Sequence, residues 1–309
     1  MRIEPTTYAE LERLAPGAVL SDEPMARHTS FGLGGPADVY VEAPDATAFE
    51  RAAELLREAG VPVKVVGRGT NLLVRSGGIE GAVLSTELAF SVLTERDGHI
   101  VVGSGVPLKS FLAFCAEAGW VGLEPLAGIP GSVGGAVFMN AGSYGTFIGD
   151  CLETVTVYRP GVGRETLSRE ELDLGYRTAR LPEGAVVVEA SFALERGDAS
   201  EVSRRLQEIL ELKWKGQPVG MRSAGCVFRN PPDVRAWQLV DQAGLRGARV
   251  GGAVVSDQHT NFILNDRGAA PEDVEELIDL IMTTVRERTG RELVLEVEIV
   301  GRSGSVANA

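Results

Sequence analysis

The stretch VGLEPLAGIPGSVGGAVFMNAGSYGTFIG, residues 121–149, decides the fold predicted for this chain, because it is rich in glycine and carries almost no charge. Such a segment is too constrained for a linker and too apolar for a disordered region. Glycines let the backbone turn several N–H groups toward one point, which creates an anion-binding nest. We expect this close approach of backbone to a ligand at Gly128–Gly135 and at Asn140–Ser143.

A third segment of the same kind, GRGTNL at residues 67–72, directly follows a predicted strand. None of the three segments matches a Walker A loop or a Rossmann GxGxxG that opens a helix. Each of them alone is more often a structural turn than a ligand site. Three in one region, two of them within an uncharged run, favour a dinucleotide that is bound through many backbone contacts.

Strands and helices alternate around these segments. Residues 37–44 alternate in the way a strand does. Residues 45–60 predict an amphipathic helix, with Asp45 as a possible N-cap and Gly60 as a stop. Residues 61–67 predict a buried strand. The helix KSFLAFCAEAG carries Cys115 on its apolar side, and the pieces GAVLS, HIVVGSG, ETVTVYR and AVVVEASFAL predict further strands.

The last third of the chain has its own pattern of helices and strands. A long helix at residues 199–215 leads into it, followed by AWQLVDQAG, an NFILN strand, a helix at residues 271–290 and a final strand at residues 293–301. The predicted fold class is therefore α+β, with two unequal domains after a short N-terminal helix.

Composition excludes several classes of function. The 309 residues carry 30 basic and 43 acidic side chains, a net charge of −13, which argues against broad binding to nucleic acid or to anionic membranes. No run approaches 18 apolar residues, and the charged N-terminus lacks the apolar core of a secretory signal. The three cysteines are far apart and show no metal-ligand spacing, so we expect reduced thiols in a cytoplasmic protein and no metal.

Several ionisable residues stand in segments that interrupt the regular pattern. Arg177 lies in LGYRTARL, Cys226 in SAGCVFRNP and His259 in DQHTNFILN, while Glu296 and Glu298 share one face of the final strand. Each has an ordinary interpretation: a surface arginine, a packed thiol, a surface histidine and a solvated strand face. For Glu298 we keep that interpretation.

Taken together, the segments resemble one enzyme family. HTSFGLGGPADVYVEAP, VVGRGTNLLVRSGGIEGAVL, GLEPLAGIPGSVGGAVFMNAGSYG, LGYRTAR, SAGCVFRNP, HTNFILN and LEVEIVG occur in this order, from roughly His28 to Gly301. This order closely resembles the UDP-N-acetylenolpyruvoylglucosamine reductase family. The long glycine run with GCVFRNP downstream is the most specific part of the match.

The resemblance implies a flavoenzyme. It places a FAD-binding domain of the vanillyl-alcohol-oxidase (PCMH) type at residues 27–198, after an N-terminal helical segment at residues 1–26, and a smaller α/β substrate-binding domain at residues 199–309. FAD would be bound non-covalently and reduced by NADPH. The reduced flavin would then deliver hydride to the enolpyruvyl group of UDP-N-acetylglucosamine-enolpyruvate, which gives UDP-N-acetylmuramate for peptidoglycan synthesis.

The resemblance also assigns residues. Arg177 would bind the enolpyruvyl carboxylate, Cys226 would donate a proton where most members carry serine, and Glu296 would help to stabilise the enolic intermediate. Substrate contacts fall to Arg229, Asn230, Tyr144 and Asn261. The FAD contacts are Gly67, Arg68, Gly69, Thr70, Asn71 and Leu72 in GRGTNL, and Gly128, Ile129, Ser132, Gly135, Asn140, Ala141 and Gly142 in the glycine run.

Three positions depart from the family pattern, and two alternatives stay open. His28 stands for asparagine and Thr70 for serine, and both keep a side chain that forms hydrogen bonds. Cys226 for serine matters more, because a free thiol, with a pKa of about 8.5, is far more acidic than an alcohol. The alternatives are an oxidase that tethers its flavin covalently and a nucleotide-binding regulator without activity. The chain is also short for members with a tyrosine-bearing loop over the substrate.

Overall fold

Residues 3–304, which this computed structural model describes, pack around separate cores in two units. Unit 1 comprises Met1–Ser21, Val39–Arg68 and Gly81–Lys213. Unit 2 comprises Asp22–Asp38, Gly69–Glu80 and Trp214–Ala309. Packing sets these limits, and they run differently from the predicted segments 1–26, 27–198 and 199–309. The functional roles of those three segments stay a prediction.

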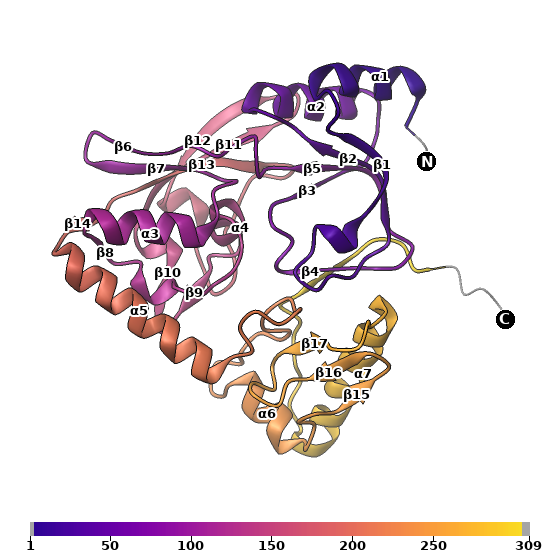
Figure 1. The fold of residues 1–309 in the computed structure, drawn as a ribbon, viewed down its shortest axis with the longest axis vertical. Coiled ribbons are helices and arrows are strands. Elements are labelled where there is room, and N and C mark those ends of the chain that lie inside the picture. Colours follow the sequence, from indigo (N-terminus) through magenta and orange to yellow (C-terminus); the bar gives the residue numbers. More distant parts are fainter. Residues whose placement is uncertain (1–2, 305–309) are drawn as a thin grey trace. The chain divides into compact units, whose positions relative to one another are not determined.

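The first sheet of unit 1 has the strand order β1-β2-β5-β3. Its strands are β1 (Val19–Pro24), β2 (Pro36–Glu42), β5 (Ile79–Ser85) and β3 (Val63–Val66), and the helices α1 (Pro5–Leu14) and α2 (Ala46–Glu58) lie side by side next to it (Figure 1). Leu11, Phe49 and Leu84 meet in their shared core. The strand predicted at residues 61–67 exists, but the prediction that it is buried was wrong. Only Val66 is buried and Val63 is 39% exposed, because one side of this edge strand is left uncovered.

The predicted N-cap of α2 is confirmed, because the Asp45 carboxylate accepts a hydrogen bond from the Ala48 backbone N–H at 2.8 Å. We expect Asp45→Ala to lower the free energy of unfolding by about 1 kcal/mol, the usual contribution of such a cap. Asp45→Asn, which keeps the acceptor, should lose much less. Urea unfolding of both variants measures the difference, and equal losses would mean that the cap does not stabilise α2.

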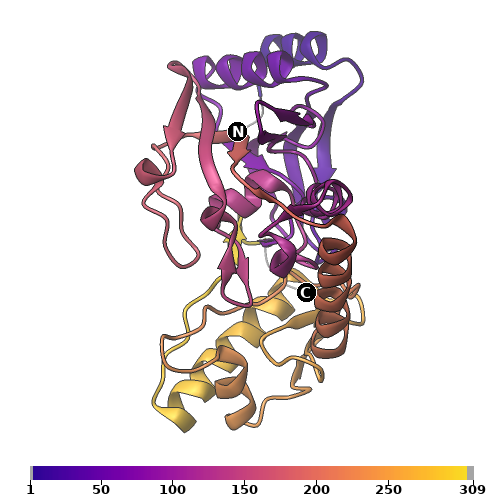
Figure 2. The ribbon, with the colours of Figure 1, turned by 90° about the vertical axis from the view of Figure 1, so that its left-hand side faces the viewer.

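The second sheet of unit 1 has the order β12-β11-β13-β7-β6, and its β11–β12 hairpin is the long pink ribbon in Figure 2. Its strands are β12 (Gly163–Ser168), β11 (Leu152–Arg159), β13 (Val186–Phe192), β7 (His99–Gly103) and β6 (Leu93–Arg96). The helices α3 (Leu108–Ala118) and α4 (Val133–Phe138) share its core. Cys115 is 2% exposed on α3, as its place on the apolar side predicted.

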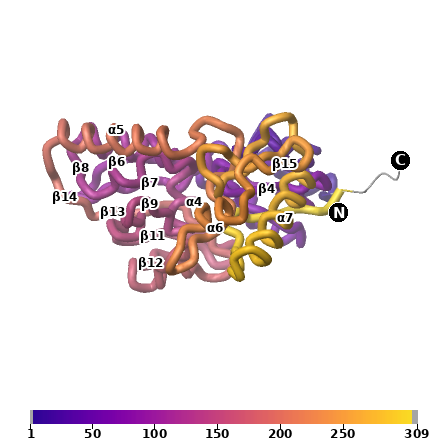
Figure 3. The backbone as a smooth tube through the Cα atoms, turned by 90° about the horizontal axis from the view of Figure 1, so that it is seen from below, coloured from indigo at the N-terminus to yellow at the C-terminus, as the bar shows by residue number. Residues whose placement is uncertain are grey.

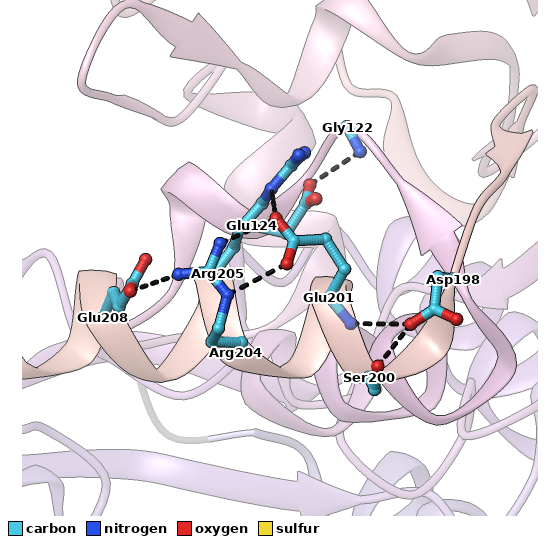
Figure 4. A network of polar contacts seen from close by, with 8 residues as sticks. All are labelled: Gly122, Glu124, Asp198, Ser200, Glu201, Arg204, Arg205 and Glu208. Atoms are coloured by element: carbon cyan, nitrogen blue, oxygen red, sulfur yellow. Dashed lines mark hydrogen bonds and ion pairs between the residues drawn. The ribbon is translucent and has the colours of Figure 1, made fainter.

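The long helix α5 (Ala199–Gly216) directly follows Asp198, whose carboxylate accepts the Glu201 N–H at 3.0 Å. Figure 4 shows the charged side of this helix, where Arg204 and Arg205 donate to the Glu201 carboxylate at 2.7 and 2.9 Å. Hydrogen bonding from Arg204 lowers the pKa of Glu201 to about 2. Exposed pairs of this kind contribute little stability, so this charged face indicates a solvated helix side.

Unit 2 contains the antiparallel sheet β15-β16-β17, formed by β15 (Arg249–Val250), β16 (Ala253–Val255) and β17 (Ile263–Asn265). The helices α6 (Ala236–Gln242) and α7 (Pro271–Thr289) pack in its core, and Figure 3 shows α7 in yellow close to β15. The remaining short elements of the described chain are the 3₁₀ turns Met25–Arg27, Glu124–Leu126, Ile148–Asp150 and Glu170–Leu172 and the strands β8 (Trp120–Val121), β9 (Gly142–Ser143), β10 (Thr146–Phe147) and β14 (Glu195–Arg196).

The final strand is shorter than predicted. Only β18 (Glu298–Val300) is regular, and it pairs in parallel with β4 (Leu72–Val74). Residues 293–297 pair instead with residues 227–229 through an isolated bridge between Phe228 and Leu295, so the change of partner interrupts the strand. Glu298 is exposed, which confirms its interpretation as part of a solvated strand face.

Candidate functional site

Two of the predicted cofactor segments meet in unit 1. Gly67 directly follows β3, and a Cβ atom built on it would lie 2.6 Å from Ser132 Oγ and 3.7 Å from Thr86 Oγ1. Ser132 belongs to the glycine run and caps α4, since its Oγ accepts the Gly135 N–H at 3.4 Å. A side chain at position 67 would therefore push the run away, and glycine is needed for the approach.

Buried hydroxyl groups lie where these segments meet. Thr86, Ser104 and Ser132 are 5%, 1% and 2% exposed. Ser104 Oγ has no hydrogen-bond partner within residues 3–304. Glycine turns and buried hydroxyls suit a ligand that carries many polar atoms of its own, so these residues fit a flavin dinucleotide.

The rest of the GRGTNL segment, Gly69–Leu72, lies in unit 2. Gly69 has φ +57°, and a Cβ there would overlap the carbonyl oxygen of His28, so the glycine allows a close backbone approach. Asn71 Nδ2 donates to the Glu296 carbonyl oxygen at 3.0 Å, and Leu72 opens β4. Gly67 and Arg68 belong to unit 1, whereas Gly69–Leu72 belong to unit 2. The role of all six residues in FAD binding stays a prediction.

The glycine run is held in place by Asn140, which is 6% exposed and has φ +39°. Its Nδ2 donates to the Gly175 carbonyl oxygen at 2.8 Å, and its Oδ1 accepts the Gly149 N–H at 3.1 Å. The loop before Arg177 is thereby tied to the glycine run. A hollow of about 320 Å³ lies beside this junction, and it is lined by Asn140, Phe147, Gly149, Asp150, Arg169, Leu174, Gly175 and Tyr176.

Arg177 stands at the tip of a tight turn. Gly175 and Thr178 exchange backbone hydrogen bonds of 3.0 and 3.3 Å, and Arg177 between them has φ +58°, which is uncommon for a non-glycine residue. Its Nη1 donates to the Gly142 carbonyl oxygen at 3.2 Å. The structure therefore brings Arg177 together with the Asn140–Gly142 part of the predicted cofactor site.

Lys213 was missed by the sequence analysis. Its side chain is 3% exposed, its Cδ would lie 2.9 Å from a Cβ on Gly128, and its Nζ lies 5.9 Å from the centre of the Tyr144 ring. Tyr144 itself is 59% exposed. A signal was available, because Lys213 stands three and four residues after Leu210 and Ile209 on the apolar stripe of α5. A lysine at such a position is either paired or functional.

In unit 2 the backbone segments of Cys226 and Glu296 lie next to each other. Cys226 pairs with Phe262 in an antiparallel bridge, and the Glu296 N–H donates to the Val227 carbonyl oxygen at 2.8 Å. Cys226 is half-buried and packs against the cluster Val254, Phe262 and Leu264. The thiol therefore has both a packing contact and partial access, and its role as proton donor stays a prediction.

The residues predicted to bind substrate are held differently. Asn261, 2% exposed, accepts the Phe228 N–H at 2.9 Å and donates to the Phe228 carbonyl at 2.8 Å, so it fixes the segment after Cys226. Asn230 Oδ1 accepts the Ala236 N–H at 2.9 Å at the start of α6. Arg229 Nε is buried without a hydrogen-bond partner inside the described chain. Their roles in substrate binding stay a prediction.

The other two thiols are unsuited to chemistry. Burial, with the nearby Glu124 charge, raises the pKa of Cys115 to about 12, and burial raises the pKa of Cys151 to about 11. We expect iodoacetamide at about pH 8 to alkylate Cys226 and to spare both of these thiols in the folded protein, because the thiolate is the reactive form. Peptide mass spectrometry, with urea-denatured protein as the control, measures this. Native labelling of Cys115 would contradict it.

Comparison with known proteins first gives the class. Residues 37–164 match the FAD binding domain family, and residues 217–300 match the family described as UDP-N-acetylenolpyruvoylglucosamine reductase, C-terminal domain. A FAD-binding domain with a hydroxyl-lined glycine cradle, followed by this second domain, defines a flavoprotein oxidoreductase. The predicted α+β fold of this type is confirmed.

The relatives then give the family. A UDP-N-acetylenolpyruvoylglucosamine reductase of Geobacter metallireducens is 43% identical over 95% of this chain and 98% of its own length, and one of Anoxybacillus flavithermus is 39% identical over 95% and 98%. The crystal structure of UDP-N-acetylenolpyruvylglucosamine reductase (MurB) from Thermus caldophilus matches with a TM-score of 0.79 at 37% identity, covering 91% of this chain and 97% of that one. This chain belongs to the UDP-N-acetylenolpyruvoylglucosamine reductase family.

No helix within residues 3–304 has the length and apolar character needed to cross a membrane. In the same part of the chain, no group of three or more His, Cys, Asp and Glu side chains is arranged to hold a metal ion.

Proposed function

We propose that this chain is a cytoplasmic enzyme that reduces the enolpyruvyl group of UDP-N-acetylglucosamine-enolpyruvate to UDP-N-acetylmuramate, with non-covalent FAD as cofactor and NADPH as reductant. The observation that carries the proposal is the 43% identity to a reductase of this name over 95% of the chain. Because the match extends through the second domain, it supports the substrate class as well as the flavin chemistry.

FAD, when bound, supplies hydride chemistry by accepting hydride from NADPH and passing it to the methylene carbon of the substrate. The residues that would hold it are Gly67–Leu72 and, in the glycine run, Gly128, Ile129, Ser132, Gly135 and Asn140–Gly142. The protein contributes mainly backbone groups and hydroxyls there. A larger residue at position 67 would prevent the close approach of the backbone to Ser132.

Hydride addition to a conjugated carboxylate builds negative charge on that carboxylate as an enolate. The Arg177 guanidinium, a planar fork of N–H donors, would bind the carboxylate in two places and stabilise the developing charge. Cys226 would then protonate the carbon beside the carboxylate, and Glu296 would help to stabilise the enolic intermediate. Arg229, Asn230, Tyr144 and Asn261 would position the rest of the substrate.

The test is an assay of NADPH oxidation that depends on the UDP-enolpyruvyl sugar, with mass spectrometry of the product. Substrate-dependent turnover supports the proposal, and NADPH oxidation that ignores the sugar contradicts it. Denaturation separates the covalent-oxidase alternative, because free FAD in the supernatant is expected here and flavin retained on the chain is expected there. A regulator without activity would bind nucleotide and give no turnover.

A further inference from the structure

A buried hydroxyl without a partner lies in the cradle between the glycine segments. Ser104, the residue after β7, is 1% exposed, yet its Oγ makes no hydrogen bond within residues 3–304. Burying a hydroxyl without a partner destabilises a protein, so such groups are rare and need an explanation. Neither the resemblance nor the predicted set of cofactor contacts includes Ser104.

The backbone N–H and carbonyl groups of Ser104 both form hydrogen bonds with other segments, so only its side-chain hydroxyl lacks a partner in the described chain. The Ser104 N–H donates to the Val188 carbonyl oxygen at 3.0 Å, and its own carbonyl oxygen accepts the Gly134 N–H at 2.9 Å. Both contacts fix the residue between the sheet of unit 1 and the start of α4. The backbone of Ser104 is therefore held in place, and its Oγ has no hydrogen-bond partner within residues 3–304.

Gly134 shows where the Ser104 side chain lies. A Cβ built on Gly134 would lie 2.5 Å from Ser104 Cβ, so the two residues touch where a larger residue at 134 would collide. Gly134 stands in the middle of the uncharged run, two residues after Ser132, which in turn approaches Gly67. Ser104 thus lies among the residues that fit the dinucleotide, all of them within unit 1.

The segment after Ser104 also follows the glycine run. The Leu108 N–H donates to the Gly131 carbonyl at 2.9 Å, the Val133 N–H donates to the Val106 carbonyl at 2.9 Å, and Pro107 and Ser132 form a bridge. Residues 104–108 therefore form one wall of the same cradle. Sequence reasoning gave them no cofactor role, because a single serine after a strand carries no motif.

From these contacts we infer that Ser104 is a further cofactor-binding residue, whose hydroxyl forms a hydrogen bond with a polar atom of bound FAD. This inference rests on the proposed function. The hydroxyl would be unsatisfied in the apoprotein and satisfied in the holoenzyme, so its energetic effect must change sign between the two states. That change of sign is what separates a cofactor contact from a structural serine.

The test compares Ser104→Ala with the wild type in both states. Alanine keeps Cβ, and with it the contact to Gly134, and removes only the unpaired oxygen. We expect the melting temperature of the apoprotein to stay equal or rise, and the dissociation constant for FAD, measured by flavin fluorescence on titration, to increase about three- to tenfold, the effect of one net hydrogen bond. The holoenzyme should also release FAD faster on dilution.

A matched control is Ser85→Ala, at a serine of 0% exposure whose Oγ accepts the Glu87 N–H at 3.3 Å. Because its hydroxyl already has a partner in the protein, this variant should lower the melting temperature of the apoprotein, opposite to Ser104→Ala. If Ser104→Ala lowers apoprotein stability by a similar amount and leaves FAD affinity unchanged, the hydroxyl is structural and the inference is wrong. A wild type that binds no FAD would instead overturn the proposed function itself.

Discussion

Arg177→Lys is expected to fold normally, to bind FAD and to lose most of its turnover with the enolpyruvyl substrate. Lysine keeps the positive charge but replaces a planar fork of donors with a single ammonium group, which cannot bind a carboxylate in two places. Loss of a preorganised donor to a developing oxyanion costs about 10²- to 10³-fold in kcat. Arginine and lysine are equally strained at φ +58°, so the substitution should not change the stability of the turn from Gly175 to Thr178.

The two half-reactions separate this role from a general loss of structure. Flavin reduction by NADPH, followed by bleaching of the flavin absorbance in a stopped-flow instrument, should survive, while reoxidation by the substrate should be slow. Arg180→Lys is the matched control, because Arg180 lies in the same segment and its side chain is 79% exposed. Arg177 is not a substrate-carboxylate residue if both half-reactions fall equally.

Local patterns in the sequence predicted the helices well, because each depends on its own residues. The apolar stripe from Phe49 to Leu56, capped by Asp45, and the buried face of α3 appear as expected. The short helix α4 inside the glycine run was not predicted, and the other errors lie in the strands, whose burial depends on distant partners. β3 has an apolar sequence but lies at a sheet edge, and residues 293–301 divide their pairing between residues 227–229 and β4.

The candidate site shows the same division. The glycine segments were visible because glycine spacing is local, whereas neither Ser104 nor Lys213 belongs to a motif, and the structure shows both to be buried. Ser104 is notable only because the fold removes every partner from its hydroxyl in the described chain. Lys213 stands on an apolar stripe, a signal that composition alone hides. Arg177 has an ordinary surface pattern, and its contact with Gly142 in the structure links it to the predicted cofactor run.

Cys226→Ala should lose most of the activity, about 10²-fold or more, because a positioned general acid contributes on that scale. Cys226→Ser should retain substantial activity, since serine can donate the same proton from the same place. The alanine variant should still oxidise NADPH through FAD and should reduce the substrate slowly, with solvent as a poor donor. Cys115→Ala is the control for packing, because that thiol is 2% exposed within the core, so its loss should lower stability without changing the activity per bound flavin.

The pH dependence gives an independent test of the same role. The donor must be the neutral thiol, so activity should be present below the pKa of the thiol and be lost as the pH rises through it. A serine hydroxyl does not ionise in this range, so Cys226→Ser should keep its activity at alkaline pH while the wild type declines. Profiles of kcat/KM for both proteins measure this difference. If the two profiles coincide, and Cys226→Ala remains fully active, then Cys226 only packs against Val254, Phe262 and Leu264.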